Sequence, residues 1–137
     1  MKKRTPISKI MTTDIISVNK TQTLNEVADI IADKHIRHVP VVSGKKIIGM
    51  LSKVDLAKIS FINTFDGESM TTAMFEALTI DQVMTKNIST VQASDTIYEV
   101  AQNLSESEFH ALPVLDEEEL VGIVTSTDLI KYLVDQF

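Results

Sequence analysis

The sequence predicts a mixed fold of the α/β (α+β) class, built from two copies of one β-α-β-β-α unit. The first observation is an internal repeat, because a shift of 73 residues aligns residues 7–58 with residues 80–131 without a gap. About 15 of these 52 positions are identical, where chance would give roughly 3. The second is that both copies carry the same order of strand and helix patterns. A unit of ~50 residues cannot cover both faces of its sheet, so we expect the copies to pack through their sheets about a pseudo-twofold axis.

Each copy opens with a short β-branched run, at residues 15–18 and 88–91, which predicts a strand. A helix should follow, because apolar residues recur at i, i+3, i+4 and i+7. A capping box is predicted at each helix start, where Thr and Glu side chains satisfy the free N–H groups of the first turn. The residues that carry this pattern are Thr23, Leu24, Glu26, Val27, Ala28 and Ile31, and then Thr96, Ile97, Glu99, Val100, Ala101 and Leu104.

A hairpin of largely buried strands comes next in each copy. Apolar runs at residues 39–42 and 47–51 flank one polar turn, and runs at residues 112–115 and 120–124 flank another. A second helix should begin near Lys53 in the first copy and near Ser126 in the second.

We expect residues 1–60 to form the first repeat, residues 61–79 a connector, and residues 80–137 the second repeat. In the connector, a loop is predicted around Phe61, Phe65, Asp66 and Gly67. A short helix is predicted from the spacing of Met70, Ala73, Met74, Ala77 and Leu78. Core packing explains this stripe of Met and Ala better than a partner-binding surface does.

Composition limits the functions that this chain of 137 residues can have. It contains no cysteine, which excludes disulfides, thiolate catalysis and Cys-based metal sites. The formal net charge of -6 argues against a nucleic-acid surface. Apolar stretches such as residues 47–51 are far shorter than the ~18 residues of a membrane span, and no apolar segment follows the basic residues at positions 2–4. We therefore expect a cytoplasmic protein without nucleic-acid or membrane partners.

The candidate functional residues lie where each hairpin runs into its second helix. Both junctions read G-h-h-[ST]-x-x-D, with Ser52 and Asp55 in the first copy and Thr125 and Asp128 in the second. A hydroxyl and the first N–H groups of a helix favour an anion. The aspartate can accept hydrogen bonds from two neighbouring hydroxyls, as a ribose presents, so the set suits a nucleoside phosphate. The same pattern is also a plain capping box, so a structural role remains open for both aspartates.

Basic residues precede the first strand of each hairpin. Arg37 can bind phosphate through two parallel hydrogen bonds, and His38 and His110 can add donors. The spacing of His35 and His38 alone does not make a metal site, because no third ligand joins them in the sequence.

These repeated motifs resemble the CBS domain, which occurs as a tandem pair called a Bateman module. The shared features are the V-x-x-x-x-T-h-x-x-[AV] helix start, the h-P-V strand and the G-h-h-[ST]-x-x-D ending, and they cover residues 7–134. The resemblance implies two clefts between the repeats and assembly into a homodimer. It also implies a ligand that contains adenosine. Ligands of this class are AMP, ADP, ATP, S-adenosylmethionine and cyclic di-AMP.

The resemblance assigns roles residue by residue. It places ribose at the motif aspartates, phosphate or ribose at the motif hydroxyls, phosphate at the basic residues, and adenine near the threonines that start the first helices. The second copy carries an extra hydroxyl, Thr127, where the first has Val54, although Ala111 departs from the basic pattern. We therefore expect the Asp128 cleft to be the better site. The ligand-binding residues implied are Asp128, Thr125, Thr127, His110, Arg37, His38, Asp55, Ser52, Thr23 and Thr96.

The sequence thus predicts a non-catalytic module that senses an adenine nucleotide and signals to a partner protein in trans, with no required cofactor. A structural interaction module without a physiological nucleotide is the alternative. An enzyme is disfavoured, because no nucleophile–base pair, carboxylate pair or metal cluster occurs at a recognisable spacing.

Overall fold

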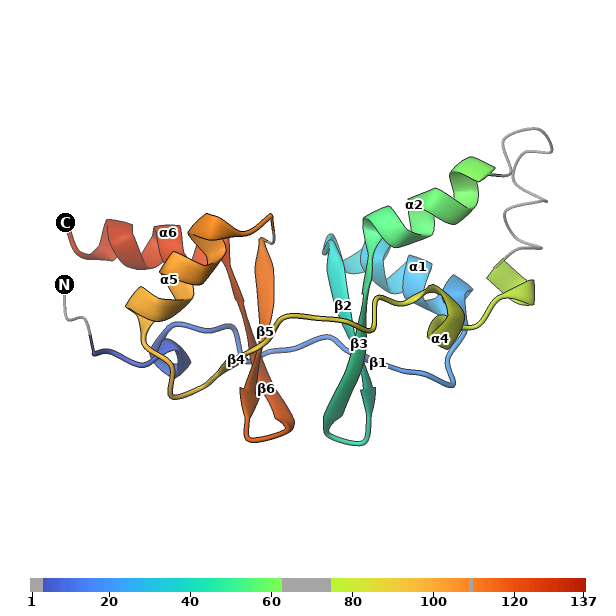
Figure 1. Ribbon diagram of the computed structural model, residues 1–137. Coiled ribbons are helices and arrows are strands. Elements are labelled where there is room, and N and C mark those ends of the chain that lie inside the picture. Colours follow the sequence, from blue (N-terminus) through green and yellow to red (C-terminus); the bar gives the residue numbers. More distant parts are fainter. Residues whose placement is uncertain (1–3, 63–74, 109) are drawn as a thin grey trace. The chain divides into compact units, whose positions relative to one another are not determined.

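The computed structural model describes residues 4–62, 75–108 and 110–137 and confirms the mixed α+β fold. The chain divides into two compact units that cut across the sequence repeats. The Asp55 unit comprises Ile16–Ile88, and the Asp128 unit combines Met1–Ile15 with Ser89–Phe137. Each unit has three paired strands and its own core (Figure 1).

The Asp55 unit has the predicted order of elements. Its sheet pairs β1 in parallel with β2, and β2 antiparallel with β3. The elements are β1 (Val18–Asn19), α1 (Leu24–Lys34), β2 (His38–Ser43), β3 (Lys46–Ser52), α2 (Lys53–Ile62) and α4 (Ile80–Val83).

The Asp128 unit repeats this arrangement. Its sheet pairs β4 in parallel with β5, and β5 antiparallel with β6. The elements are a 3-10 turn η1 (Ile7–Lys9), β4 (Val91–Gln92), α5 (Ile97–Glu106), β5 (Ala111–Asp116), β6 (Glu119–Thr125) and α6 (Ser126–Asp135).

The two copies exchange the segments that precede their first strands. In the Asp128 unit, the amide of Ile7 donates to the carbonyl of Asp95 at 2.7 Å, and Thr12 and Ile123 exchange backbone hydrogen bonds of 2.8 and 2.9 Å. In the Asp55 unit, Met50 and Thr85 exchange two bonds of 2.9 Å. The segment at the start of each repeat therefore pairs with the second hairpin strand of the other repeat.

Glycine permits this close backbone approach. A Cβ atom on Gly122 would lie 3.1 Å from the carbonyl oxygen of Thr12 and would meet the side chain of Met11. A Cβ atom on Gly49 would lie 3.1 Å from the carbonyl oxygen of Thr85 and would meet Met84. The motif glycines therefore make room for the exchanged segments.

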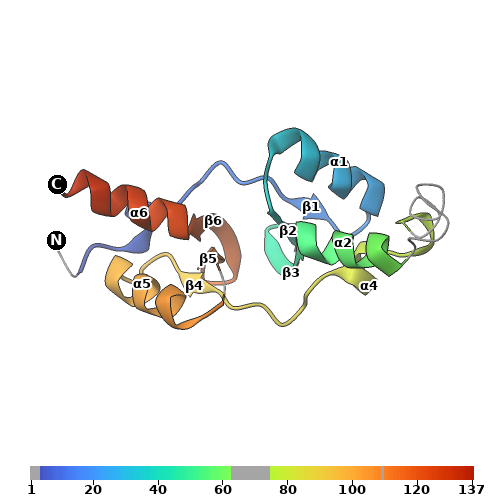
Figure 2. The same cartoon turned by 90° about the horizontal axis from the view of Figure 1, so that it is seen from above.

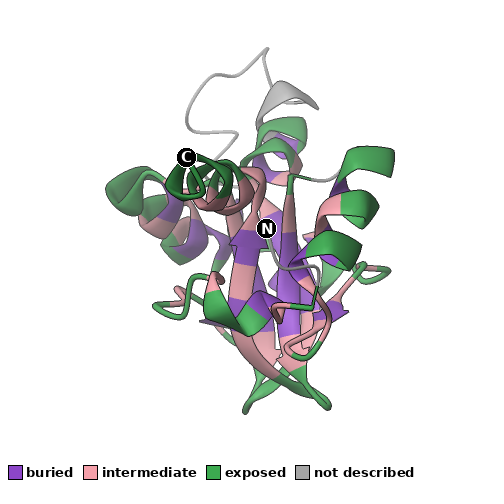
Figure 3. Cartoon of the chain, turned by 90° about the vertical axis from the view of Figure 1, so that its left-hand side faces the viewer, coloured by how far each residue is buried: buried purple, intermediate pink, exposed green. Residues whose placement is uncertain are grey.

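Apolar burial agrees with the predicted helix stripes. Leu24, Val27 and Ile31 of α1 and their counterparts in α5 are buried against the strands. Figures 1 and 2 show the two long helices of each unit side by side on one face of its sheet. Figure 3 shows buried residues on the strands and exposed residues along the outer sides of the helices.

Three local predictions need correction. The first strands are only two residues long, Val18–Asn19 and Val91–Gln92, because only these residues pair with the neighbouring strand. Residue 61 belongs to α2, which continues to Ile62, so the loop does not begin there. The predicted boxes at Thr23 and Thr96 are half formed, since each hydroxyl accepts a backbone N–H at 3.1 Å but the glutamate does not return the bond.

Part of the connector lies outside the described residues, including Phe65, Asp66, Gly67, Met70, Ala73 and Met74. At its end, Leu78 packs against the core of the Asp55 unit, whereas Ala77 is exposed. No helix in the described part of the chain is long and apolar enough to cross a membrane.

Candidate functional site

Asp128 caps the helix that it begins. The amide of Thr125 donates to Oδ2 of Asp128 at 2.9 Å, and the amide of Asp128 donates to the hydroxyl of Thr125 at 3.1 Å. Both side chains are half-buried. This reciprocal pair satisfies two N–H groups at the start of α6 and fixes the carboxylate there.

Asp55 has the same geometry at the start of α2. The amide of Ser52 donates to Oδ2 of Asp55 at 2.9 Å, and the amide of Asp55 donates to the Ser52 hydroxyl at 3.1 Å. The capping role is therefore present in both copies. It uses the same carboxylate oxygen in each and leaves the other oxygen for a further donor.

A hydroxyl already binds the Asp128 carboxylate. The Thr12 hydroxyl donates to Oδ1 of Asp128 at 3.2 Å and to Oδ2 at 3.3 Å. These distances exceed the usual ~2.7–2.8 Å of an O–H···O bond, and Thr12 is exposed, so another hydroxyl could replace it. Among the described residues, no matching bond joins Thr85 to Asp55.

Sequence reasoning did not select Thr12 as a site residue. The repeated pairs Met11-Thr12 and Met84-Thr85 were a usable signal. Their meaning depends on the exchange of segments, which brings Thr12 to the second copy's helix and not to its own.

Backbone pairing brings the basic residues to the same junctions. The amide of Lys53 donates to the carbonyl of Arg37 at 2.9 Å, and His38 is paired with Ser52 in the sheet. In the other unit, the amide of Ser126 donates to the carbonyl of His110 at 3.0 Å. Arg37 and His110 are exposed, which makes their side chains accessible to an anion.

The remaining predicted residues are placed unevenly. Thr127 is exposed on the first turn of α6, and Val54, its counterpart on α2, is 63% exposed. Thr23 is the N-cap of α1, whereas the C-cap of that helix, His35, lies near the Lys53 junction. At ~1.5 Å per residue, the 11 residues of α1 separate Thr23 from that junction by roughly 16 Å. Thr96 likewise starts α5 as its N-cap.

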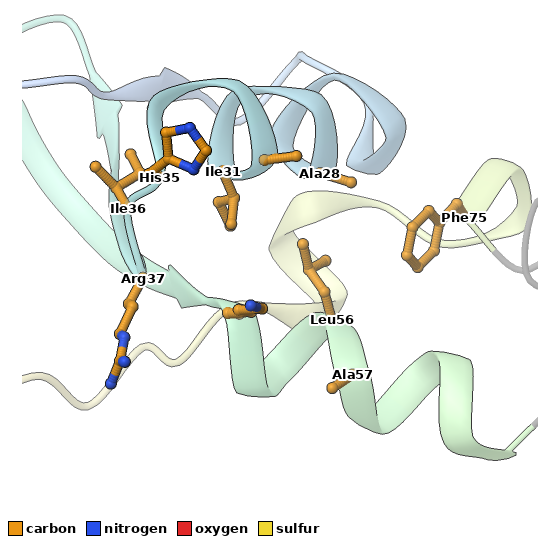
Figure 4. Close-up of a pocket in the computed structure, with 10 residues that line it drawn as sticks. Ala28, Ile31, His35, Ile36, Arg37, Leu56, Ala57 and Phe75 are labelled. Atoms are coloured by element: carbon orange, nitrogen blue, oxygen red, sulfur yellow. The ribbon is translucent and has the colours of Figure 1, made fainter.

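A cavity of about 560 Å³ lies within the Asp55 unit. Its lining comes from α1, the approach to β2, the first turns of α2, and Phe75 (Figure 4). Arg37 and Lys53 line it, so the basic residues border both the capping junction and this cavity. Among the residues that the structure describes, no group of three or more His, Asp or Glu side chains could hold a metal ion.

Comparison with known families decides the classification. The CBS domain family matches the chain twice, at residues 7–61 and 80–135. This chain belongs to the CBS domain family. The two matches account for most of the sequence and confirm the resemblance seen in its motifs.

Solved CBS structures share the fold. CBSX2 from Arabidopsis thaliana superposes with a TM-score of 0.84 at 20% identity, with 96% of each chain covered. The CBS domain pair of protein MJ0100, solved with 5′-methylthioadenosine and S-adenosyl-L-methionine, has a TM-score of 0.77 at 25% identity, covering 97% of this chain and 98% of that one. CBSX2 has also been solved with AMP.

The curated relatives include much longer proteins. A homoserine O-acetyltransferase from Methanohalobium evestigatum is 27% identical over 135 residues, which is 97% of this chain. The chain spans about a quarter of that enzyme's length, since 25% of it is covered. The similarity therefore concerns the CBS pair, which is a regulatory module.

Proposed function

We propose that this CBS domain pair binds an adenosine-containing nucleotide through its strand-to-helix junctions. The observation that carries the proposal is the hydrogen bond from the Thr12 hydroxyl to the Asp128 carboxylate. This carboxylate is fixed by its capping bonds, faces an exposed threonine, and accepts that threonine's hydroxyl. The hydroxyls of a ribose offer the same donors to the same two oxygens.

Charge at the junction supports a phosphorylated ligand. His110 lies beside the start of α6, and Arg37 and His38 lie beside the start of α2. The dipoles of α2 and α6 add to their attraction for an anion. Ribose at the aspartate and phosphate at the basic residues would thus bind in one orientation.

The comparisons favour an adenine compound over other nucleotides. The MJ0100 pair contains two adenosine derivatives, and CBSX2 contains AMP. We propose AMP, ADP or ATP as the ligand, with S-adenosylmethionine and cyclic di-AMP as further members of the same class.

The alternative function is a structural module without a nucleotide. It has its own support, because both aspartates cap the helices that they begin. In that case each aspartate contributes only the roughly 0.5–2 kcal/mol typical of a capping side chain.

We propose that the module acts on a partner protein in trans and that it is a homodimer without catalytic activity of its own. Ligand binding would shift the equilibrium between two states of the module. The size of that shift is limited by the difference between the ligand's affinities for the two states. The outer side of α6 supplies apolar surface for assembly, since Ile130, Leu133 and Val134 are 60%, 42% and 62% exposed.

A ligand panel tests the proposed function. Purified protein would be melted with AMP, ADP, ATP, S-adenosylmethionine, cyclic di-AMP and, as a non-adenine control, GTP. A ligand at ~100 times its Kd adds about 2.7 kcal/mol of stability, which raises the Tm by several degrees. A rise with an adenine compound but not with GTP supports the proposal. No rise at millimolar concentrations contradicts it and favours the structural module.

A further inference from the structure

We propose that the cavity between α1 and α2 of the Asp55 unit binds a second ligand, a small amphiphilic anion with an apolar body and one anionic head group. Its volume of about 560 Å³ falls in the range of roughly 300–1,000 Å³ typical of small-molecule sites. The ligand differs from the proposed nucleotide, because the apolar walls offer no acceptor for the hydroxyls of a ribose, although Arg37 borders both sites.

The walls of the cavity are apolar and partly buried. Ile31, Leu56 and Phe75 are 6%, 6% and 8% exposed, so they form its floor. The small side chains of Ala28, Ala32 and Ala57 leave space above that floor. Binding of an apolar ligand body would be favourable here, because it removes both the floor residues and the ligand's apolar surface from water.

The polar side chains that line the cavity are basic. His35, Arg37 and Lys53 line it, and the described lining has no acidic side chain. Figure 4 shows His35 and Arg37 at one end, Phe75 at the other, and Ile31 and Leu56 between them. The carboxylate of Asp55, nearby on α2, is held by the Ser52 amide. This polarity fits an anionic head at the His35–Arg37 end and an apolar tail directed toward Phe75.

The duplicated unit provides an internal comparison. At the offset of 73, the second copy keeps apolar residues at the positions of Ala28, Ile31 and Leu56. It replaces Ala32 with Ser105, His35 with Glu108 and Lys53 with Ser126. It also fills the position of Ala57 with Ile130. The basic lining and the open volume of the cavity are therefore features of the first copy and are not required by the CBS fold.

Isothermal titration with decanoate tests this proposal directly. Decanol, decyltrimethylammonium and decyl phosphate serve as uncharged, cationic and phosphate-headed comparisons. We expect decanoate and decyl phosphate to bind, and decanol and decyltrimethylammonium to bind at least fivefold more weakly. Equal binding of decanoate and decanol would overturn the assignment, as would no decanoate binding up to its solubility limit.

Substitutions taken from the second copy locate the site. Lys53→Ser should weaken decanoate binding about fivefold, as expected for loss of one exposed charge pair. The control Lys58→Ser, on the same helix but outside the cavity lining, should have no effect. Ala57→Ile should abolish binding by filling the cavity, with folding checked by circular dichroism. If Lys53→Ser and Lys58→Ser behave alike, the site is wrong.

One further variant separates this proposal from nucleotide binding at the Asp128 junction. Asp128→Ala lies in the other unit and should leave decanoate affinity unchanged. Loss of decanoate binding in Asp128→Ala would contradict a separate cavity site, whatever the nucleotide panel shows.

Discussion

Each aspartate of the repeated motif binds its own helix through one oxygen and can accept a ligand mainly through the other. At Asp55, Oδ2 takes the Ser52 amide. At Asp128, Oδ2 takes the Thr125 amide, and the Thr12 hydroxyl reaches both oxygens. A ribose at Asp128 must therefore displace the Thr12 hydroxyl and donate hydrogen bonds from its own hydroxyls. This exchange costs little, because one O–H donor takes the place of another.

The motif glycines serve packing at the residue scale. Gly122→Ala should destabilise the Asp128 unit by about 1–3 kcal/mol, because the new methyl group meets Met11 and the Thr12 carbonyl. Urea unfolding measures this change. Shortening the neighbour should relieve part of the strain, so Gly122→Ala combined with Met11→Ala should cost less than the sum of the single changes by at least 0.5 kcal/mol. Strict additivity would show that the methionine is not the obstacle.

At the scale of elements, the exchanged segments determine which parts of the chain unfold together. Ile7 is fully buried in the core of the Asp128 unit, and Ile80 is fully buried in the core of the Asp55 unit. Each therefore stabilises the hairpin of the other sequence repeat.

Hydrogen exchange can test this exchange of segments. Ile7→Ala should cost roughly 2–5 kcal/mol and should lower amide protection in β5 and β6 more than in β2 and β3. Ile80→Ala should give the reverse pattern. If Ile7→Ala instead weakens β2 and β3, the segments pack within their own repeats and the described units are wrong.

Local patterns predicted most elements because local chemistry determines them. The stripes of α1 and α5, the hairpins, and the helix starts at Lys53 and Ser126 follow from side-chain spacing and capping. The role of Thr12 and the exchange of segments could not be read this way, since they depend on contacts between residues far apart in the sequence, such as Thr12 with Asp128 and Met50 with Thr85. The α1–α2 cavity likewise arises from the packing of two helices and from Phe75.

The capping pattern shows the limit of motif reading at the same scale. The Thr-x-x-Glu sequences at Thr23 and Thr96 form only the hydroxyl half of a box. At α1, the Glu26 carboxylate accepts instead from the Gln22 amide at 3.0 Å. Complete boxes occur at Ser52 with Asp55, at Thr79 with Gln82 and at Thr125 with Asp128. Both partners of a box were predictable as residue types, but the second bond depends on competing neighbours.

At the scale of the whole molecule, the exposed apolar residues of α6 bear on assembly. If α6 is the dimer surface, Ile130→Lys combined with Val134→Lys should convert a dimer into a monomer, because two buried charges would be left unpaired. Sedimentation velocity measures the outcome. Lys131→Glu on the same helix is a control for surface charge. A double variant that remains dimeric would place the dimer surface elsewhere.

Nucleotide binding by the whole module rests on the difference between its two junctions. Both Asp128→Ala and Asp55→Ala remove a reciprocal cap of equal geometry, so their costs to stability should be similar. The Asp128 unit places the Thr12 hydroxyl on its aspartate and carries Thr127 directly before it, where the Asp55 unit has Val54. Any difference in ligand affinity between the two variants therefore reports ligand contact and not helix capping.

The most direct test is isothermal titration of the wild type and these two variants with the adenine nucleotide that raises the Tm most. We predict that Asp128→Ala weakens binding at least tenfold and weakens it more than Asp55→Ala does. Affinity that is unchanged in both variants, despite equal losses of stability, would contradict a ligand role for the motif aspartates.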